Sequence, residues 1–151
     1  MKTFIASALV AGLASAGAAV PGNKVCVANM AGFDLHWWST DLNLGESTAT
    51  SKNYPIDQTV CQTISVSGIA EGDFIETYIH ADGGVTQAVD SAIIYQSSPA
   101  ITVSYTCTGA TLTYNCRLNG EAYLQQLKDL GMWDELELAA ERLNMPEFYL
   151  N

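Results

Sequence analysis

The two histidines, His36 and His80, are the side chains whose chemistry first suggests acid–base catalysis. Carboxylates that could pair with one or other histidine are found at Asp34, Asp73, Glu76 and Asp82. A catalytic base also needs a third group to orient it, and no serine stands in a G-x-S-x-G elbow. We therefore interpret both histidines as surface or strand-end residues, and we predict no catalytic residues and no enzymatic activity.

A second constellation that could do chemistry is the set of carboxylates at turns. Glu71, Asp73 and Asp82 supply the hard oxygen ligands that calcium prefers. Their spacing matches no EF-hand loop, and the neighbouring Gly72 and Gly83 are typical of solvated turns. We predict no metal site and no cofactor.

The adjacent tryptophans Trp37 and Trp38 are the best candidates for ligand binding. Successive residues of a strand point to opposite faces of the sheet, so one tryptophan belongs to the core and the other to the surface. An exposed Trp38 beside His36 could stack on a sugar or enter a membrane interface. The alternative is that Trp38 is covered by the 39–55 loop or by the C-terminal segment.

Four cysteines, at positions 26, 61, 107 and 116, predict two disulfides in a secreted chain. Cys107 and Cys116 point to the apolar side of neighbouring strands, which favours Cys107–Cys116 with Cys26–Cys61. The pairing Cys26–Cys116 with Cys61–Cys107 stays open. A cross-strand bond between Cys107 and Cys116 requires a longer or bulged connection, because a two-residue turn at 109–110 would place residue 112 opposite Cys107.

The first residues predict a signal peptide over 1–19. Lys2 precedes an apolar run from Phe4 to Leu13, and small residues typical of a cleavage site follow. The run is shorter than the roughly 20 residues that cross a bilayer. We expect a secreted protein, or one in an organelle reached through the secretory pathway.

Residues 20–118 alternate apolar and polar residues with period two and are rich in Val, Ile, Thr and Tyr. Runs of this kind are separated by turn residues, and the run 101–118 is typical of a hairpin around Thr108, Gly109 and Ala110. The predicted fold is mainly β, an antiparallel β-sandwich of about seven or eight strands.

The period changes at residue 119, and 119–151 is predicted to be an acidic amphipathic helical tail. Two short helices, 121–130 and 132–143, are separated by Gly131, and each carries one apolar stripe. Two helices this short need a surface to cover, either their own sandwich or another chain. We favour another chain, and the candidate partner-binding residues are Leu124, Leu127, Trp133, Leu136 and Leu143.

The formal charge of −10 and the scattering of the six basic residues exclude two classes of partner. Nucleic acids and anionic membranes both require clustered Lys and Arg. A protein partner, self-assembly or a glycan is compatible with this composition.

Short motifs give the chain a resemblance to a known group. They are the run 54–58 with a cysteine soon after it, Glu71-Gly72-Asp73, and the hairpin 105–116. Over about residues 24–118 the chain resembles small secreted four-cysteine β-sandwich proteins of microalgae and other microbes, which have no established activity. The resemblance implies the sandwich and the cysteine framework, and no chemistry.

Two functional hypotheses follow from the sequence. The first is a secreted, non-enzymatic binding or structural module that docks to a protein through its helical tail. The second is a glycan-binding or membrane-active β-sandwich that uses Trp38 and the 39–55 loop.

Overall fold

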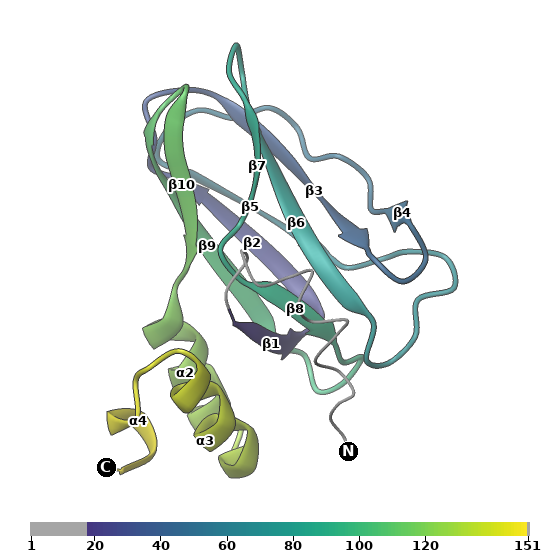
Figure 1. Ribbon diagram of the computed structural model, residues 1–151, viewed down its shortest axis with the longest axis vertical. Helices are drawn as coiled ribbons and strands as arrows, with labels where there is room; N and C mark the ends of the chain where they lie inside the picture. The colour runs from purple at the N-terminus through teal and green to yellow at the C-terminus, as the bar shows by residue number, and fades with distance from the viewer. Residues whose placement is uncertain (1–17, 151) are drawn as a thin grey trace.

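The computed structural model describes residues 18–150, so most of the predicted signal peptide lies outside the described residues. Within them the chain forms two β-sheets followed by a helical tail (Figure 1). The six-stranded sheet consists of β1 (Ala19–Gly22), β8 (Ala92–Tyr95), β6 (Phe74–Ala81), β3 (Leu35–Asp41) and β4 (Glu46–Ser47) in that order, with β7 (Thr86–Ala88) paired to β6. The four-stranded sheet consists of β10 (Thr113–Leu118), β9 (Thr102–Ala110), β2 (Lys24–Asn29) and β5 (Gln58–Thr63).

The two sheets form the predicted sandwich, because the alternating apolar residues of both meet in one core. β2 and β9 contribute Val27, Val103 and Tyr105, and they belong to the same buried cluster as Trp37 of β3 and Ile79 of β6. All five are fully buried. The period-two pattern therefore identified the core face of these strands correctly.

The predicted fold, a mainly β sandwich with a helical tail, is confirmed, and the structure differs from the predicted antiparallel sandwich of about seven or eight strands in two details. The described residues contain ten strands, of which β4 has two residues and β7 has three. Two of the strand pairs are parallel, β1 with β8 and β2 with β9. A parallel pair joins strands that are far apart in the chain, so no turn motif between them indicates the pairing in the sequence.

Both disulfides have the favoured pairing, Cys26–Cys61 and Cys107–Cys116. Each joins residues that lie directly opposite each other on neighbouring antiparallel strands. The longer or bulged connection expected for Cys107–Cys116 is not present: β9 and β10 are joined by a two-residue turn at 111–112, two positions after the 109–110 position considered in the sequence, and this shift brings Cys107 opposite Cys116.

The helical tail was predicted correctly as two short helices that break at Gly131, where φ is 71°. The structure has α2 (Gly120–Asp129), α3 (Trp133–Arg142) and a further turn, α4 (Glu147–Leu150). The N–H of Met132 donates to the carbonyl of Leu127 across the break, which closes the end of α2.

The tail covers one end of the sandwich, at the bottom of Figure 1. The Tyr123 hydroxyl donates to the carbonyl of Pro21 in β1. The Gln126 side chain both donates to the carbonyl and accepts from the N–H of Thr102 in β9, each at 2.9 Å. Arg142 donates to the carbonyl of Ala19. The tail is thus bonded directly to the backbone of both sheets.

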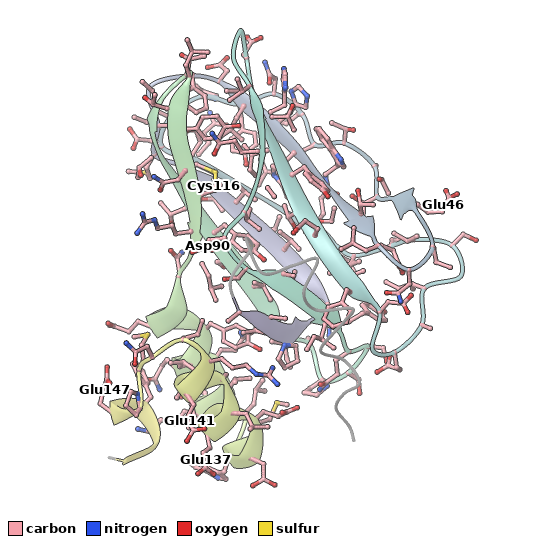
Figure 2. The ribbon with its side chains drawn as sticks, viewed as in Figure 1. Glu46, Asp90, Cys116, Glu137, Glu141 and Glu147 are labelled. Atoms are coloured by element: carbon pink, nitrogen blue, oxygen red, sulfur yellow. A yellow bond between two sulfur atoms is a disulfide. The ribbon has the colours of Figure 1, made fainter. Side chains whose placement is uncertain are left out.

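Acidic side chains of the tail lie on its side away from the sandwich, whereas its apolar side chains pack in the core. Figure 2 shows Glu137, Glu141 and Glu147 on the tail, away from the strands. A carboxylate outside the tail, that of Asp90, accepts from the N–H of Leu118 in β10. This bond connects the β7–β8 segment to the four-stranded sheet.

Candidate functional site

The outer face of the six-stranded sheet carries a row of aromatic side chains that we call the aromatic strip: His36 and Trp38 on β3, and Tyr78 and His80 on β6. Strand alternation places all four on the face opposite the core, since Leu35, Trp37 and Ile79 between them are fully buried. Antiparallel register places His36 opposite His80 and Trp38 opposite Tyr78.

The rings of the strip lie close to one another. The Trp38 and Tyr78 ring centroids are 6.1 Å apart, with 25° between the planes. The His36 ring lies 6.1 Å from that of Trp38 and 5.1 Å from that of His80. All four side chains are partly exposed, so the strip forms a continuous aromatic surface in contact with solvent.

The structure confirms that Trp37 and Trp38 point to opposite faces. Trp37 is fully buried in the core. The hydrogen bonds of the helical tail are to β1 and β9 at the end of the sandwich, so the tail lies away from Trp38. The 39–55 loop runs beside β3 as an edge segment, with the N–H of Ser51 donating to the carbonyl of Trp37 and that of Thr48 to the carbonyl of Ser39.

One carboxylate lies next to the aromatic pair. Glu76 precedes Tyr78 on the same face of β6 and lies opposite Thr40 of β3. Its side chain is 5% exposed, and Oε1 is buried with no hydrogen-bond partner among the described residues. Burial raises the pKa of Glu76, and its charge helps to raise that of Tyr78. Because this oxygen is shielded from solvent, a ligand on the sheet face cannot reach it in the conformation described.

A second unusual carboxylate lies at the far end of β3, outside the strip. Asp41 is fully buried, and its Oδ1 accepts from the N–H groups of Asn43 and Leu44. Its Oδ2 has no donor among residues 18–150, and the carboxyl of Asp73 lies against it. Desolvation, followed by the contact with Asp73, raises the pKa of Asp41.

Asp41→Asn is expected to stabilise the protein at pH 7 by on the order of 1 kcal/mol. The amide keeps the oxygen that accepts from Asn43 and Leu44 and supplies an N–H toward Asp73. Because the folded pKa of Asp41 is raised, its contribution to stability is full below the unfolded value of 3.8 and is lost as pH rises through the folded value. Urea unfolding should therefore show the variant's advantage at pH 7 and a smaller one at pH 3.5, and an advantage independent of pH would contradict this account.

The turn carboxylates considered for calcium do not come together. Glu71 and Asp73 precede β6, whereas Asp82 follows it at the opposite end of the strand. Glu71 accepts from the N–H of Ser97, and Asp73 accepts from that of Ala70. These are turn contacts, as the neighbouring glycines indicated.

The candidate partner-binding residues lie mostly inside the molecule, which corrects the preference for docking through the apolar stripes. Leu124, Leu127 and Leu136 are fully buried in the same core cluster as the sandwich, and Leu143 is half-buried against it. Trp133 alone of the five is largely exposed, at 58%. The stripes were identified correctly, but the surface that they cover is the protein's own sandwich.

A hollow of about 550 Å³ lies between α2 and the end of the tail, remote from the strip, and it is lined by Asn119, Gly120, Glu121, Ala122, Gln125 and Phe148. It contains no aromatic pair and no buried carboxylate of the kind found at Glu76. The strip is therefore the stronger candidate for a binding site.

Sequence reasoning found His36 and Trp38, named Glu76 only as a possible acid–base partner of a histidine, and missed Tyr78. A signal was present, since Glu76, Tyr78 and His80 alternate in one strand as His36, Trp38 and Thr40 do in another. Only the register of β3 against β6 shows that the two alternations lie side by side, and 32 residues separate the ends of these strands in the chain.

Comparisons with known proteins assign no family. No family model matches the chain, and no curated protein matches it. Among solved structures, the chain is similar to pneumolysin with a TM-score of 0.36 and 9% identity, over 64% of this chain and 23% of that one. The chain thus spans about a quarter of the length of that protein, and a likeness at this level assigns neither a family nor a function.

Proposed function

We propose that this protein is a secreted, non-enzymatic module that binds a neutral glycan on the aromatic strip. The observation that supports the proposal is the pairing of Trp38 with Tyr78 on an outer sheet face, where both rings are partly exposed. The proposal develops the glycan hypothesis drawn from Trp38 in the sequence.

The chemistry of a sugar ring matches the strip. The C–H face of a pyranose packs on an aromatic ring, and its hydroxyls extend sideways toward polar groups. At the strip, the polar side chain next to the rings that is partly open to solvent is Thr40, which follows Trp38 on the same face of β3. Ligand sites typically combine an apolar surface with a few placed polar groups in this way.

Charge narrows the class of glycan. The chain carries a net charge of −10, and Glu76, which lies beside the strip, adds to the local negative potential. Acidic polysaccharides would be repelled by this field. Neutral glucose- or N-acetylglucosamine-based oligosaccharides are therefore the probes of choice.

Binding without hydrolysis is the simpler interpretation of this face. Glycoside hydrolysis requires two carboxyl groups on either side of the scissile bond. Glu76 lies opposite Thr40, with Tyr78 as its neighbour on the same strand, and the carboxylates Asp34 and Asp82 belong to the other end of the two strands. We accordingly propose no catalytic step.

Secretion is part of the proposal. The two disulfides fit an extracellular protein. Among residues 18–150, no helix has the length and apolar character needed to cross a membrane. The predicted signal peptide would deliver the chain to the secretory route.

Trp38→Ala is expected to weaken glycan binding at least about 10-fold, because it removes the larger of the two stacked rings. Binding can be found on a glycan array and measured by calorimetry with the best oligosaccharide. Trp133→Ala is the matched control, since it removes an exposed tryptophan of the tail. Equal binding by both variants, or no binding by the wild type, would refute the proposal.

A second candidate function keeps one element of the docking hypothesis. Trp133 and Leu130 are 58% and 45% exposed at the turn between α2 and α3, where apolar side chains could contact a protein partner. In that case Trp133→Ala would abolish complex formation in native extracts and leave glycan binding intact.

A further inference from the structure

The two histidines form one end of the aromatic strip, and the glycan proposal is argued from the rings of Trp38 and Tyr78 at its other end. His36 and His80 lie directly opposite each other on antiparallel strands, with ring centroids 5.1 Å apart. In the sequence they are 44 positions apart, and each was interpreted there as an ordinary surface residue. Their juxtaposition is a result of the register between β3 and β6.

Each imidazole is held in place through its Nδ1 atom. His36 Nδ1 lies 3.1 Å from Oδ1 of Asn53, and this oxygen can only accept, so Nδ1 is the donor. His80 Nδ1 lies 2.7 Å from the hydroxyl of Thr86, which can accept in the same way. A hydrogen bond from Nδ1–H leaves the lone pair on Nε2, the arrangement found in metal-binding histidines.

The surroundings favour a cation. Asp34 immediately precedes β3 and Asp82 immediately follows β6, and the N–H of Asp82 donates to the carbonyl of Asp34 at 2.8 Å. Both aspartates are exposed. Their charges lie at the end of the strip where the histidines are and would attract a cation to it.

We propose that His36 and His80 bind a transition-metal ion of the Zn²⁺ class through their two Nε2 atoms, with water completing the coordination. In residues 18–150, no group of three or more His, Cys, Asp or Glu side chains is placed to hold a metal ion. The site is therefore a two-histidine chelate at the surface, unlike the closed four-ligand sites that hold structural zinc. Imidazole selects Zn²⁺, Ni²⁺ and Cu²⁺ over Ca²⁺ and Mg²⁺.

The composition of the chain excludes other strong transition-metal ligands from the test. It has two histidines in all, and all four cysteines are in disulfides, so no other imidazole or thiolate can bind the metal. The untagged protein is titrated with Zn²⁺ and Ni²⁺ by calorimetry and with Cu²⁺ by electron paramagnetic resonance, which reports coordinated nitrogen. We expect one metal ion per chain, two nitrogens on Cu²⁺, and no heat with Mg²⁺.

The variants distinguish a chelate from two independent histidines. In a chelate, His36→Gln and His80→Gln each lower the affinity to that of the double variant. Asn53→Ala, which removes the group that orients His36, is expected to weaken binding roughly 10-fold. Zn²⁺ affinity that survives in either single histidine variant, or a Cu²⁺ spectrum with one nitrogen, would overturn the proposal. The glycan proposal is independent of this outcome, because it rests on Trp38 and Tyr78.

Discussion

Leu136→Asp is expected to lower the free energy of unfolding by about 4 kcal/mol or more, since it removes a fully buried side chain and places a charge in the core. The midpoint of thermal unfolding should fall by at least about 10 °C. Circular dichroism in the far ultraviolet would show whether the helices are lost first or the whole domain unfolds at once. Loss of the whole domain at once would show that the tail and the sandwich share one core, whereas loss of the helices alone would show that Leu136 is held chiefly within the tail.

Leu138→Asp is the matched control, because it makes the same substitution two residues along the same helix. Leu138 is 50% exposed, so its replacement should change stability by no more than about 0.5 kcal/mol. If Leu136→Asp behaves like Leu138→Asp in the isolated protein, then α3 does not occupy the position described. The docking hypothesis for the apolar stripes would then need to be reopened.

The position of the tail shows where sequence reasoning reaches its limit. The 3.6-residue period identified Leu124, Leu127 and Leu136 as one-sided, and a one-sided helix must cover something. The period contains no information about which surface that is. The contacts that settle it are non-local: Tyr123 binds the carbonyl of Pro21, 102 residues earlier, and Gln126 binds Thr102.

The strands show the same division between local and non-local information. Alternation in β3 placed Trp37 and Trp38 on opposite faces, and the structure confirms this. The hairpin β9–β10 was recognised because its strands are adjacent in the chain. The parallel pairing of β2 with β9 was not predictable in this way, since more than 70 residues separate the two strands.

The candidate site was half predictable for this reason. Trp38 and His36 lie in one strand, and their alternation with buried residues is visible in the sequence. Tyr78, Glu76 and His80 lie in another strand, and they join the site only through the β3–β6 register. A binding surface that spans two strands far apart in the chain is a property of the topology, whereas each half of it is a property of a local pattern.

Replacing both cysteines of Cys26–Cys61 by alanine is expected to cost about 4 kcal/mol, because this bond joins residues 35 positions apart. Cys107–Cys116 joins residues 9 positions apart, and the loss of its loop constraint should cost about 3 kcal/mol. Cys107 and Cys116 are also buried in the core, so alanine leaves a cavity there that adds to the second cost. Urea unfolding of both pairs of variants measures these values, and the variant without any cysteine should be largely unfolded at 37 °C.

The order in which the two bonds are reduced in the native protein provides an independent check on their placement. Thiolate attack requires access to a sulfur atom. Cys61 is exposed on β5, whereas Cys107 is fully buried and Cys116 nearly so. Mild reduction followed by alkylation and peptide mapping should therefore open Cys26–Cys61 first. Prior loss of Cys107–Cys116 would mean that the β9–β10 hairpin opens to solvent, and the inner face of the four-stranded sheet would then not be the closed core described here.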